Sequence, residues 1–421
     1  MDRPRRILIL TADDGFGHRS AANAVAAAFK QQYAGRCQVD IINPIDDPRV
    51  APILRESAAD YDRIVRLSPQ LYQLGYDASD YVVPSAIMES ALTLLLYEVM
   101  RDLIDTHQPD AILTTYPLYQ IPLLSVYAIN RRHIPLVTTV TDLATVHRTW
   151  FVPRVDACVV PTPIVQGLAL SHGLGPDQIH PLGIPVNPLF AAPRPSKAEL
   201  RARLGWDPNL LTVLAVGSRR VDRLVDALNV VNHFGAPLQA IAVAGRDAEL
   251  FAELRSLEWH IPAHVYEFAA NIPEMMLAAD LIICKAGGLI VTEALAAGLP
   301  LLLVDAIPGQ ETGNAAYVVE NGAGELVQSP VEILQTLGHW LGSQRQMLDS
   351  RMRQAASLGH PRAALDVADL LWTLAQRGPA DLSRRRIIER SGLIDLLTSN
   401  HIPWDFHPVL TRLTRPGDRS H

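Results

Sequence analysis

Two short stretches of this chain combine residue types that can carry chemistry. The first, Gly15-Phe-Gly-His18, follows an apolar run, and its glycines let the backbone bend sharply at a strand-to-helix turn. The imidazole of His18 can accept a proton near neutral pH. The second, Lys285-Ala-Gly-Gly288, also lies between an apolar run and a helical pattern. Main-chain N–H groups, the helix dipole and the Lys285 charge could hold a diphosphate there.

Two further groups of residues follow in the same half of the chain. Glu293 lies early in the helical pattern after Lys285-Ala-Gly-Gly288, where a carboxylate could bind the two hydroxyls of a ribose. Gln310 and Glu311 follow an apolar run and offer an amide and a carboxylate that could bind sugar hydroxyls. The alternative for each is an ordinary structural role, as a surface carboxylate or a helix cap.

Short apolar runs alternate with longer helical patterns along the chain. The strands and helices that they predict must position the residues named above. In the first half, strands are expected at 6–12, 38–42, 111–115, 136–140 and 158–160, with a helix at 20–32. After a proline-rich stretch at 183–195, strands are expected at 211–216, 239–244, 264–268, 281–284 and 301–304. This alternation predicts an α/β protein with two facing Rossmann-like domains and a cleft between them.

The domain boundaries follow from the same pattern. We expect an N-terminal domain at 1–185, a linker at 186–197, a second domain at 198–358, a C-terminal helix at 359–378 and a basic tail of unknown role at 379–421.

Composition excludes several classes of protein. The chain has 421 residues, 48% of them hydrophobic, which is enough to bury two cores. Its formal net charge of −7 argues against a general nucleic-acid-binding protein, because phosphate contact needs concentrated Lys and Arg. The three cysteines lie far apart and favour neither a disulfide framework nor a zinc site. No signal peptide or membrane-spanning segment is expected, which favours the cytoplasm.

Five motifs follow one another between residues 15 and 314. They are the Gly-x-Gly-His turn at 15–18 with Arg19-Ser-Ala, then Thr141-Asp-Leu-Ala-Thr145, Gly183-Ile-Pro-Val186, Lys285-Ala-Gly-Gly288 and Pro308-Gly-Gln-Glu-Thr-Gly-Asn314. In this order they resemble the monogalactosyldiacylglycerol synthase and processive diacylglycerol glucosyltransferase group of glycosyltransferase family 28. The chain is more distantly similar to the peptidoglycan N-acetylglucosaminyltransferase of that family. The resemblance implies the GT-B fold, with the donor in the C-terminal half and a lipid acceptor in the N-terminal half.

The resemblance also implies roles for individual residues. It places Phe268 beside the uracil of the donor and Glu293 on the ribose, with Gln310 and Glu311 on the transferred sugar. His18 and Asp142 are the candidate catalytic bases. The donor-binding set is Ser218, Phe268, Lys285, Ala286, Gly287, Gly288, Glu293, Gln310 and Glu311, and the acceptor side adds Gly15, Gly17 and His147.

The implied reaction is an inverting transfer of galactose or glucose from UDP-galactose or UDP-glucose to diacylglycerol, which gives a β-glycosyl diacylglycerol. Such a reaction needs a base for the acceptor alcohol and positive potential for the departing UDP. His18 or Asp142 supplies the base in this hypothesis. Because no metal-binding Asp-x-Asp motif lies in a suitable place, we expect no metal and no cofactor.

Alternatives remain beside this activity. The acceptor could be another lipid or a polyprenyl-linked molecule, or the scaffold could carry a UDP-sugar epimerase. Phe16 stands where the relatives usually have a third glycine, which keeps a non-catalytic UDP-sugar-binding protein open. The aromatic residues between Tyr61 and Tyr81 could contact an anionic membrane surface. The expected location is therefore the cytoplasmic, inner face of the plasma membrane.

Overall fold

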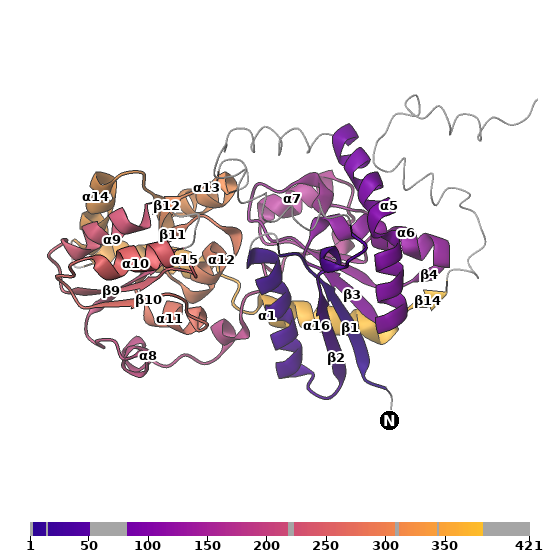
Figure 1. Cartoon of the computed structure of the whole chain (residues 1–421), viewed down its shortest axis with the longest axis horizontal. Helices are drawn as coiled ribbons and strands as arrows, with labels where there is room; N and C mark the ends of the chain where they lie inside the picture. The colour runs from indigo at the N-terminus through magenta and orange to yellow at the C-terminus, as the bar shows by residue number, and fades with distance from the viewer. Residues whose placement is uncertain are drawn as a thin grey trace, which may run out of the picture.

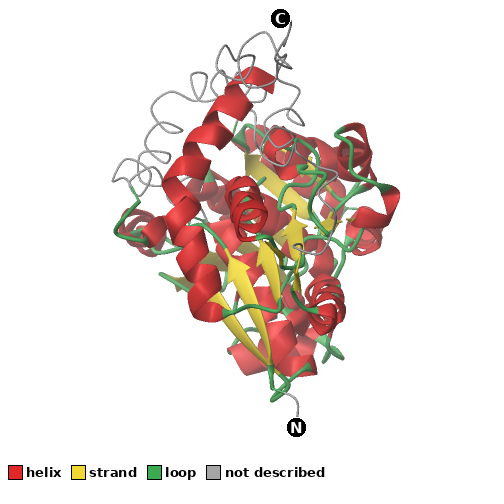
Figure 2. Cartoon of the chain, turned by 90° about the vertical axis from the view of Figure 1, so that its right-hand side faces the viewer, coloured by secondary structure: helices red, strands yellow, loops and turns green. Residues whose placement is uncertain are grey.

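The computed structural model describes residues 3–13, 16–50, 82–217, 223–307, 311–342 and 345–381 (Figure 1). Its N-terminal half is built on a parallel six-stranded sheet in the order β2-β1-β3-β5-β6-β7. These strands are β1 Arg5–Leu10, β2 Cys37–Ile42, β3 Ala111–Thr114, β5 Leu136–Thr139, β6 Ala157–Val159 and β7 Ile179–His180. Its helices are α1 Phe16–Gln32, α5 Val82–His107, α6 Gln120–Asn130 and α7 Pro163–Ser171. Figure 2 shows the sheet enclosed between helices.

Alternation of side chains along β1 explains why helices cover both faces of this sheet. Leu8 and Leu10 belong to the core that contains residues of α5, α6 and α7. Ile7 and Ile9 belong to the opposite core, which contains residues of α1. Successive strand residues point to opposite faces, so an uninterrupted apolar strand has to be buried on both.

The C-terminal half repeats this architecture with the strand order β10-β9-β8-β11-β12-β13. Its strands are β8 Leu211–Val216, β9 Leu238–Val243, β10 Ala263–Tyr266, β11 Leu281–Lys285, β12 Leu301–Asp305 and β13 Gly324–Leu326. Its helices are α8 Lys197–Leu204, α9 Leu224–Asn232, α10 Ala248–Ser256, α11 Ile272–Ala278, α12 Gly288–Ala297, α13 Thr312–Glu320, α14 Pro330–Leu341 and α15 Gln346–Leu358. The order reverses between β8 and β11, which is where ligands bind in open α/β sheets. The predicted pair of facing Rossmann-like domains is confirmed.

The last described helix, α16 Ala363–Arg377, returns to the N-terminal half and packs beside α1 (Figure 1). Tyr33 of the N-terminal half donates a hydrogen bond of 2.6 Å to Asp369, and its ring stacks on Trp372 at 4.5 Å. The chain then forms β14 Ala380–Asp381, which pairs antiparallel with β4 Arg132–His133. The helix predicted at 359–378 therefore completes the core of the first half, while the predicted domain boundaries themselves stay a prediction.

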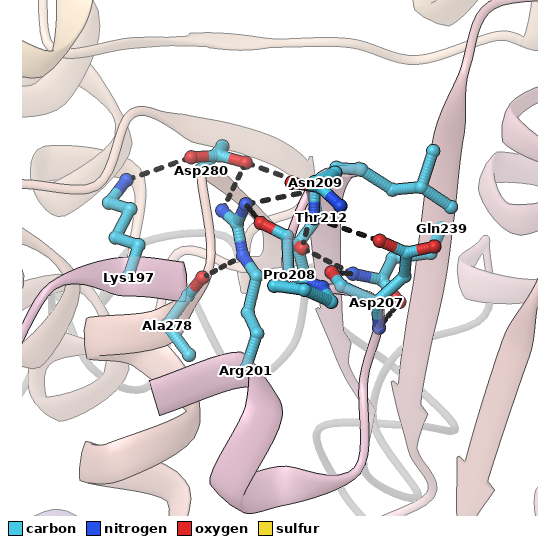
Figure 3. Close-up of polar contacts among 10 residues, drawn as sticks. Lys197, Arg201, Asp207, Pro208, Asn209, Thr212, Gln239, Ala278 and Asp280 are labelled. Carbon is cyan, nitrogen blue, oxygen red and sulfur yellow. Dashed lines mark hydrogen bonds and ion pairs between the residues drawn. The ribbon is translucent and has the colours of Figure 1, made fainter. Parts of the chain in front are cut away.

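A buried polar cluster ties α8 to the C-terminal sheet, at the end where β8 and β11 begin (Figure 3). Arg201, only 6% exposed, donates to the carbonyl oxygens of Ala278 and Leu210, at 2.9 Å each, and pairs with Asp280. Asp280 also accepts a 2.8 Å bond from the backbone N–H of Thr212. The cluster lies at the opposite end of the strands from the turn after β11, so its role is structural.

Some local expectations differ from the structure. Helix α1 begins at Phe16 and not at residue 20, which places His18 in its first turn. The strand expected at 264–268 ends at Tyr266, so Phe268 lies in the following loop. Within the described ranges, no helix combines the length and the apolar character needed to span a bilayer.

Candidate functional site

The loop after β5 brings the two halves together. It passes against the first residues of α12 and α13, where Leu143 N–H donates to the side-chain oxygen of Asn314 at 3.0 Å. A Cβ on Gly288 would lie 2.6 Å from the carbonyl oxygen of Thr141. A Cβ on Gly313 would lie 2.2 Å from the hydroxyl oxygen of Thr145. Glycine at both positions is what lets the backbone of the first half approach these two helix ends.

His18 lies on the N-terminal side of this contact. Its Nδ1 is 3.1 Å from the hydroxyl oxygen of Thr141. Its ring meets Tyr116 edge to face at 5.2 Å and lies 6.0 Å from the ring of Trp150. Thr115 donates a 3.0 Å hydrogen bond to the carbonyl oxygen of His18. The imidazole is thus held from several sides next to the interdomain loop.

Asp142 follows Thr141 and faces the C-terminal half. Burial raises the pKa of its carboxyl group to about 7, and the nearby charge of Glu311 acts in the same direction. A hydrogen bond to Asn314 and the charge of Lys285 oppose this rise in pKa. A carboxyl group that titrates near neutral pH can exchange a proton during a reaction, so Asp142 stays a candidate base. Both candidate bases, His18 and Asp142, thus lie at the contact between the two halves.

Lys285 and Glu311 form an ion pair in which Glu311 is buried and Lys285 partly buried, with side-chain exposures of 7% and 18%. The second carboxylate oxygen of Glu311 accepts a 3.0 Å bond from the backbone N–H of Ile307. Both oxygens of Glu311 are therefore used inside the protein, and the Lys285 charge is already paired. The binding of a sugar by Glu311 and of a diphosphate by Lys285 stay predictions.

The N-terminus of α12 retains the features of an anion site. Gly287 is the N-cap residue and supplies no side-chain hydrogen bond to the helix. The carbonyl oxygen of Ala286 accepts a 3.2 Å bond from Asn314, while its N–H donates to Asp305 O at 2.8 Å. The first N–H groups of a helix favour negative charge, so this turn could hold a phosphate.

Glu293 and Phe268 lie in the same half. Burial raises the pKa of the Glu293 carboxyl group, in α12, to about 7. The ring of Phe268 is 51% exposed, and the guanidinium of Arg246 lies 4.2 Å from its centroid. Arg246 follows β9 and Phe268 follows β10, which are adjacent parallel strands. An exposed aromatic ring at this edge is suited to stacking against a base.

His147 caps a short helix, a local role that the sequence motifs did not reveal. It is the N-cap of the short 3-10 helix Arg148–Trp150, and its Nδ1 lies 2.9 Å from the hydroxyl oxygen of Thr149. It therefore supports the turn that carries Trp150. A Cβ on Gly17 would meet nothing within 4 Å among the described residues, so packing against those residues does not require glycine at position 17.

Several predicted residues fall outside the described ranges. They are Gly15, Ser218 and Gln310, together with the aromatic residues from Tyr61 to Tyr81. Sequence reasoning also left some site residues without a role: Thr141, Tyr116, Trp150, Asn314 and Arg246. Thr141 and Asn314 lie inside two of the motifs, which was the one signal for them. Among the residues that the structure describes, no group of three His, Cys, Asp or Glu side chains could hold a metal ion.

Comparison with solved structures defines the class of fold. MurG of Acinetobacter baumannii matches with a TM-score of 0.57 at 17% identity, covering 88% of this chain and 100% of that chain. The calicheamicin glycosyltransferase CalG4 matches with a TM-score of 0.56 at 14% identity, covering 88% and 99%. The UDP-GlcNAc 2-epimerase of Neisseria meningitidis shares the fold, with a TM-score of 0.55 at 12% identity over 87% of this chain and 100% of that chain. The fold is GT-B.

Sequence comparison defines the family. The family model of monogalactosyldiacylglycerol (MGDG) synthase matches residues 18–186, and that of the glycosyltransferase family 28 C-terminal domain matches 212–364. Monogalactosyldiacylglycerol synthase 1 of Arabidopsis thaliana is 35% identical over 386 residues, or 89% of this chain and 72% of that protein. Synthase 2 of the same plant is 32% identical over 391 residues, or 90% and 83%.

The chain belongs to the monogalactosyldiacylglycerol synthase family, and it is a UDP-sugar-dependent glycosyltransferase. The family resemblance inferred from the motifs is thereby confirmed. The expected location at the inner face of the plasma membrane is wrong, because these relatives are named as chloroplastic proteins.

Proposed function

We propose that this protein transfers a hexose from a UDP-sugar to diacylglycerol and forms a β-glycosyl diacylglycerol. The relatives' names favour galactose as the hexose, with glucose as the second candidate. The observation that carries the proposal is the meeting of His18, Asp142 and the first turn of α12 at one seam between two Rossmann-like halves. A base and an anion site on facing domains are the two parts that a glycosyl transfer needs.

The donor fits the C-terminal half in this proposal. Its diphosphate lies at the first N–H groups of α12, its ribose hydroxyls donate to Glu293, and its uracil stacks on Phe268. The uncapped N-terminus of α12 and the exposure of the Phe268 ring support this placement. We expect no metal ion to be required, because the helix N-terminus itself favours the negative charge that develops on UDP.

The acceptor hydroxyl of diacylglycerol approaches from the N-terminal half. Its oxygen forms a bond to the anomeric carbon as the bond from that carbon to the UDP oxygen breaks, and its proton passes to the base. Attack from the side opposite to UDP converts an α-linked donor into a β-glycoside. His18 is our first choice as the base, and Asp142 is the alternative. A positioned base contributes about 10²- to 10⁴-fold to such a rate.

A membrane surface is the expected source of the acceptor, since diacylglycerol resides in bilayers. We propose that the N-terminal half contacts an anionic lipid surface while it takes up the acceptor. The exposed apolar side chains of Ile164 and Leu170, on α7 of this half, support such a contact.

Radiolabelled UDP-galactose and UDP-glucose, each supplied with diacylglycerol vesicles, test the activity. We expect label in the lipid phase and, by NMR, a β-configured product. In this assay His18→Ala should lower kcat by at least about 100-fold while UDP affinity stays near normal. His339→Ala, on the exposed face of α14, is the control. Activity that survives His18→Ala but not Asp142→Asn would assign the base to Asp142.

Three other results would change the proposal. UDP binding without transfer to any lipid would favour a non-catalytic UDP-sugar-binding protein. Interconversion of the UDP-sugar in the absence of acceptor would favour an epimerase, which the shared fold of the Neisseria enzyme keeps as the second candidate. Label on a polyprenyl phosphate but not on diacylglycerol would keep the transferase and replace its acceptor.

A further inference from the structure

We propose that Thr141 is a positioning residue that accepts a hydrogen bond from Nδ1–H of His18 and so holds the imidazole with its lone pair on Nε2. The inference rests on the proposed function, because it assigns His18 the task of accepting a proton. It comes from one contact, the 3.1 Å separation between the hydroxyl oxygen of Thr141 and Nδ1 of His18. Nothing in the five sequence motifs had given this threonine a role of its own.

The chemistry of imidazole explains why this contact matters. A neutral imidazole carries its proton on one nitrogen and its lone pair on the other. A threonine hydroxyl can accept from Nδ1–H or donate to a bare Nδ1, so the 3.1 Å distance fits either tautomer. In the proposed arrangement the Thr141 oxygen accepts from Nδ1–H, and the lone pair on Nε2 acts as the base. Fixing a catalytic histidine in this way places it in the reactive tautomer before the acceptor arrives.

The surroundings of Thr141 make it a firm support. Thr141 is only 6% exposed, so water competes little for its hydroxyl group. The carbonyl oxygen of Thr141 lies against Gly288 of α12. Two residues later, the N–H of Leu143 donates a hydrogen bond to the side chain of Asn314 in α13. The backbone that carries this hydroxyl group therefore lies against α12 and α13, next to the turn that would hold the diphosphate.

Thr141→Val is the informative change, because valine keeps the branched shape and removes the hydroxyl group. We expect kcat to fall between about 10- and 100-fold, with the donor KM and the affinity for UDP within about twofold of the wild type. Thr141→Ser, which restores a hydroxyl group, should recover most of the lost kcat. Its recovery would separate hydrogen bonding from packing.

A matched control lies two residues away. Thr139, on β5, is also buried, and among the described residues its hydroxyl oxygen has no hydrogen-bond partner. Thr139→Val makes the same change in shape and polarity without removing a contact to His18. It should therefore leave kcat and the lipid product unchanged.

A second readout tests the inference independently of activity. In the full-length protein, ¹⁵N NMR of the His18 ring, assigned by comparison with His18→Gln, should report a proton on Nδ1. Thr141→Val should shift the ring toward the other tautomer, and Thr139→Val should not. An unchanged ring spectrum together with normal kcat in Thr141→Val would overturn the role of Thr141. If the wild type transferred no sugar, the proposed function would fail, while the ring spectrum would still judge this contact.

Discussion

Gly313 and Thr145 fit together so closely that a side chain at position 313 would force the backbone apart at this contact. A Cβ on residue 313 would lie 2.2 Å from the Thr145 hydroxyl oxygen and 2.7 Å from its backbone nitrogen. Contacts of this length cannot be relieved by a side-chain rotation alone, because one of the two atoms belongs to the backbone. The pair thus sets how near α13 can come to the loop after β5.

Gly313→Ala should therefore keep the two halves apart. We expect kcat/KM to fall at least about tenfold, while UDP affinity of the C-terminal half changes little. The control is Gly338→Ala, in α14, where an added Cβ would meet nothing within 4 Å. Steady-state kinetics and UDP titration distinguish the two variants. Normal turnover in Gly313→Ala would show that this close approach is dispensable.

Asp142→Asn should change how stability depends on pH. The folded pKa of about 7 lies above the ordinary aspartate pKa of 3.8, so folding disfavours the ionised form of Asp142. That side chain therefore costs stability progressively as pH rises from about 4 to about 7, and by a constant amount above that range. The asparagine variant avoids this cost, so its stability advantage over the wild type should grow by about 4 kcal/mol between pH 4 and pH 8. Urea unfolding at pH 4, 6 and 8 measures the difference, and a difference that does not vary with pH would contradict it.

The Lys285–Glu311 pair should be needed for folding as well as for any role with the donor. Glu311→Gln leaves the partly buried Lys285 charge without this partner, which should cost about 1–3 kcal/mol. Glu320→Gln, at the exposed end of α13, should alter unfolding by less than about 0.5 kcal/mol. Urea unfolding without ligand makes the comparison.

A double variant separates structure from substrate binding at this pair. Lys285→Met with Glu311→Gln should recover part of the lost stability, because no uncompensated charge remains. If Glu311→Gln instead lowered kcat/KM with no loss of stability, the carboxylate would be acting on the sugar, as the family resemblance implied.

Arg201→Leu should destabilise the C-terminal half without touching the site. Its loss leaves two carbonyl oxygens and the Asp280 carboxylate short of a donor, at a cost of about 3–5 kcal/mol (Figure 3). Arg203→Leu on the same helix removes an exposed pair with Glu274 and should cost at most about 1 kcal/mol. Thermal unfolding compares the two. A lowered UDP affinity in folded Arg201→Leu protein would mean that the cluster supports the donor site.

The alternation of apolar runs predicted the architecture because each run reports its own burial. Ile7 to Leu10 form an uninterrupted apolar stretch, and such a strand has to lie inside a sheet covered on both faces. The two glycine motifs then fall at carboxyl ends of strands, where a parallel sheet places its ligands. The start of α1 was misjudged, since Phe16, Gly17 and His18 give no strong helix signal of their own.

The sequence by itself determined two α/β halves, the family, and the placement of His18 and the Lys285 turn at strand ends, because periodicity and local motifs depend only on neighbouring residues. The tertiary structure decided which side chains meet. Thr141 contacts His18 across 123 residues of sequence, Glu311 pairs with Lys285, and α16 returns to α1. Such contacts arise only when each sheet is assembled and helices cover its faces, and no local pattern encodes the distance between residues that far apart in the chain.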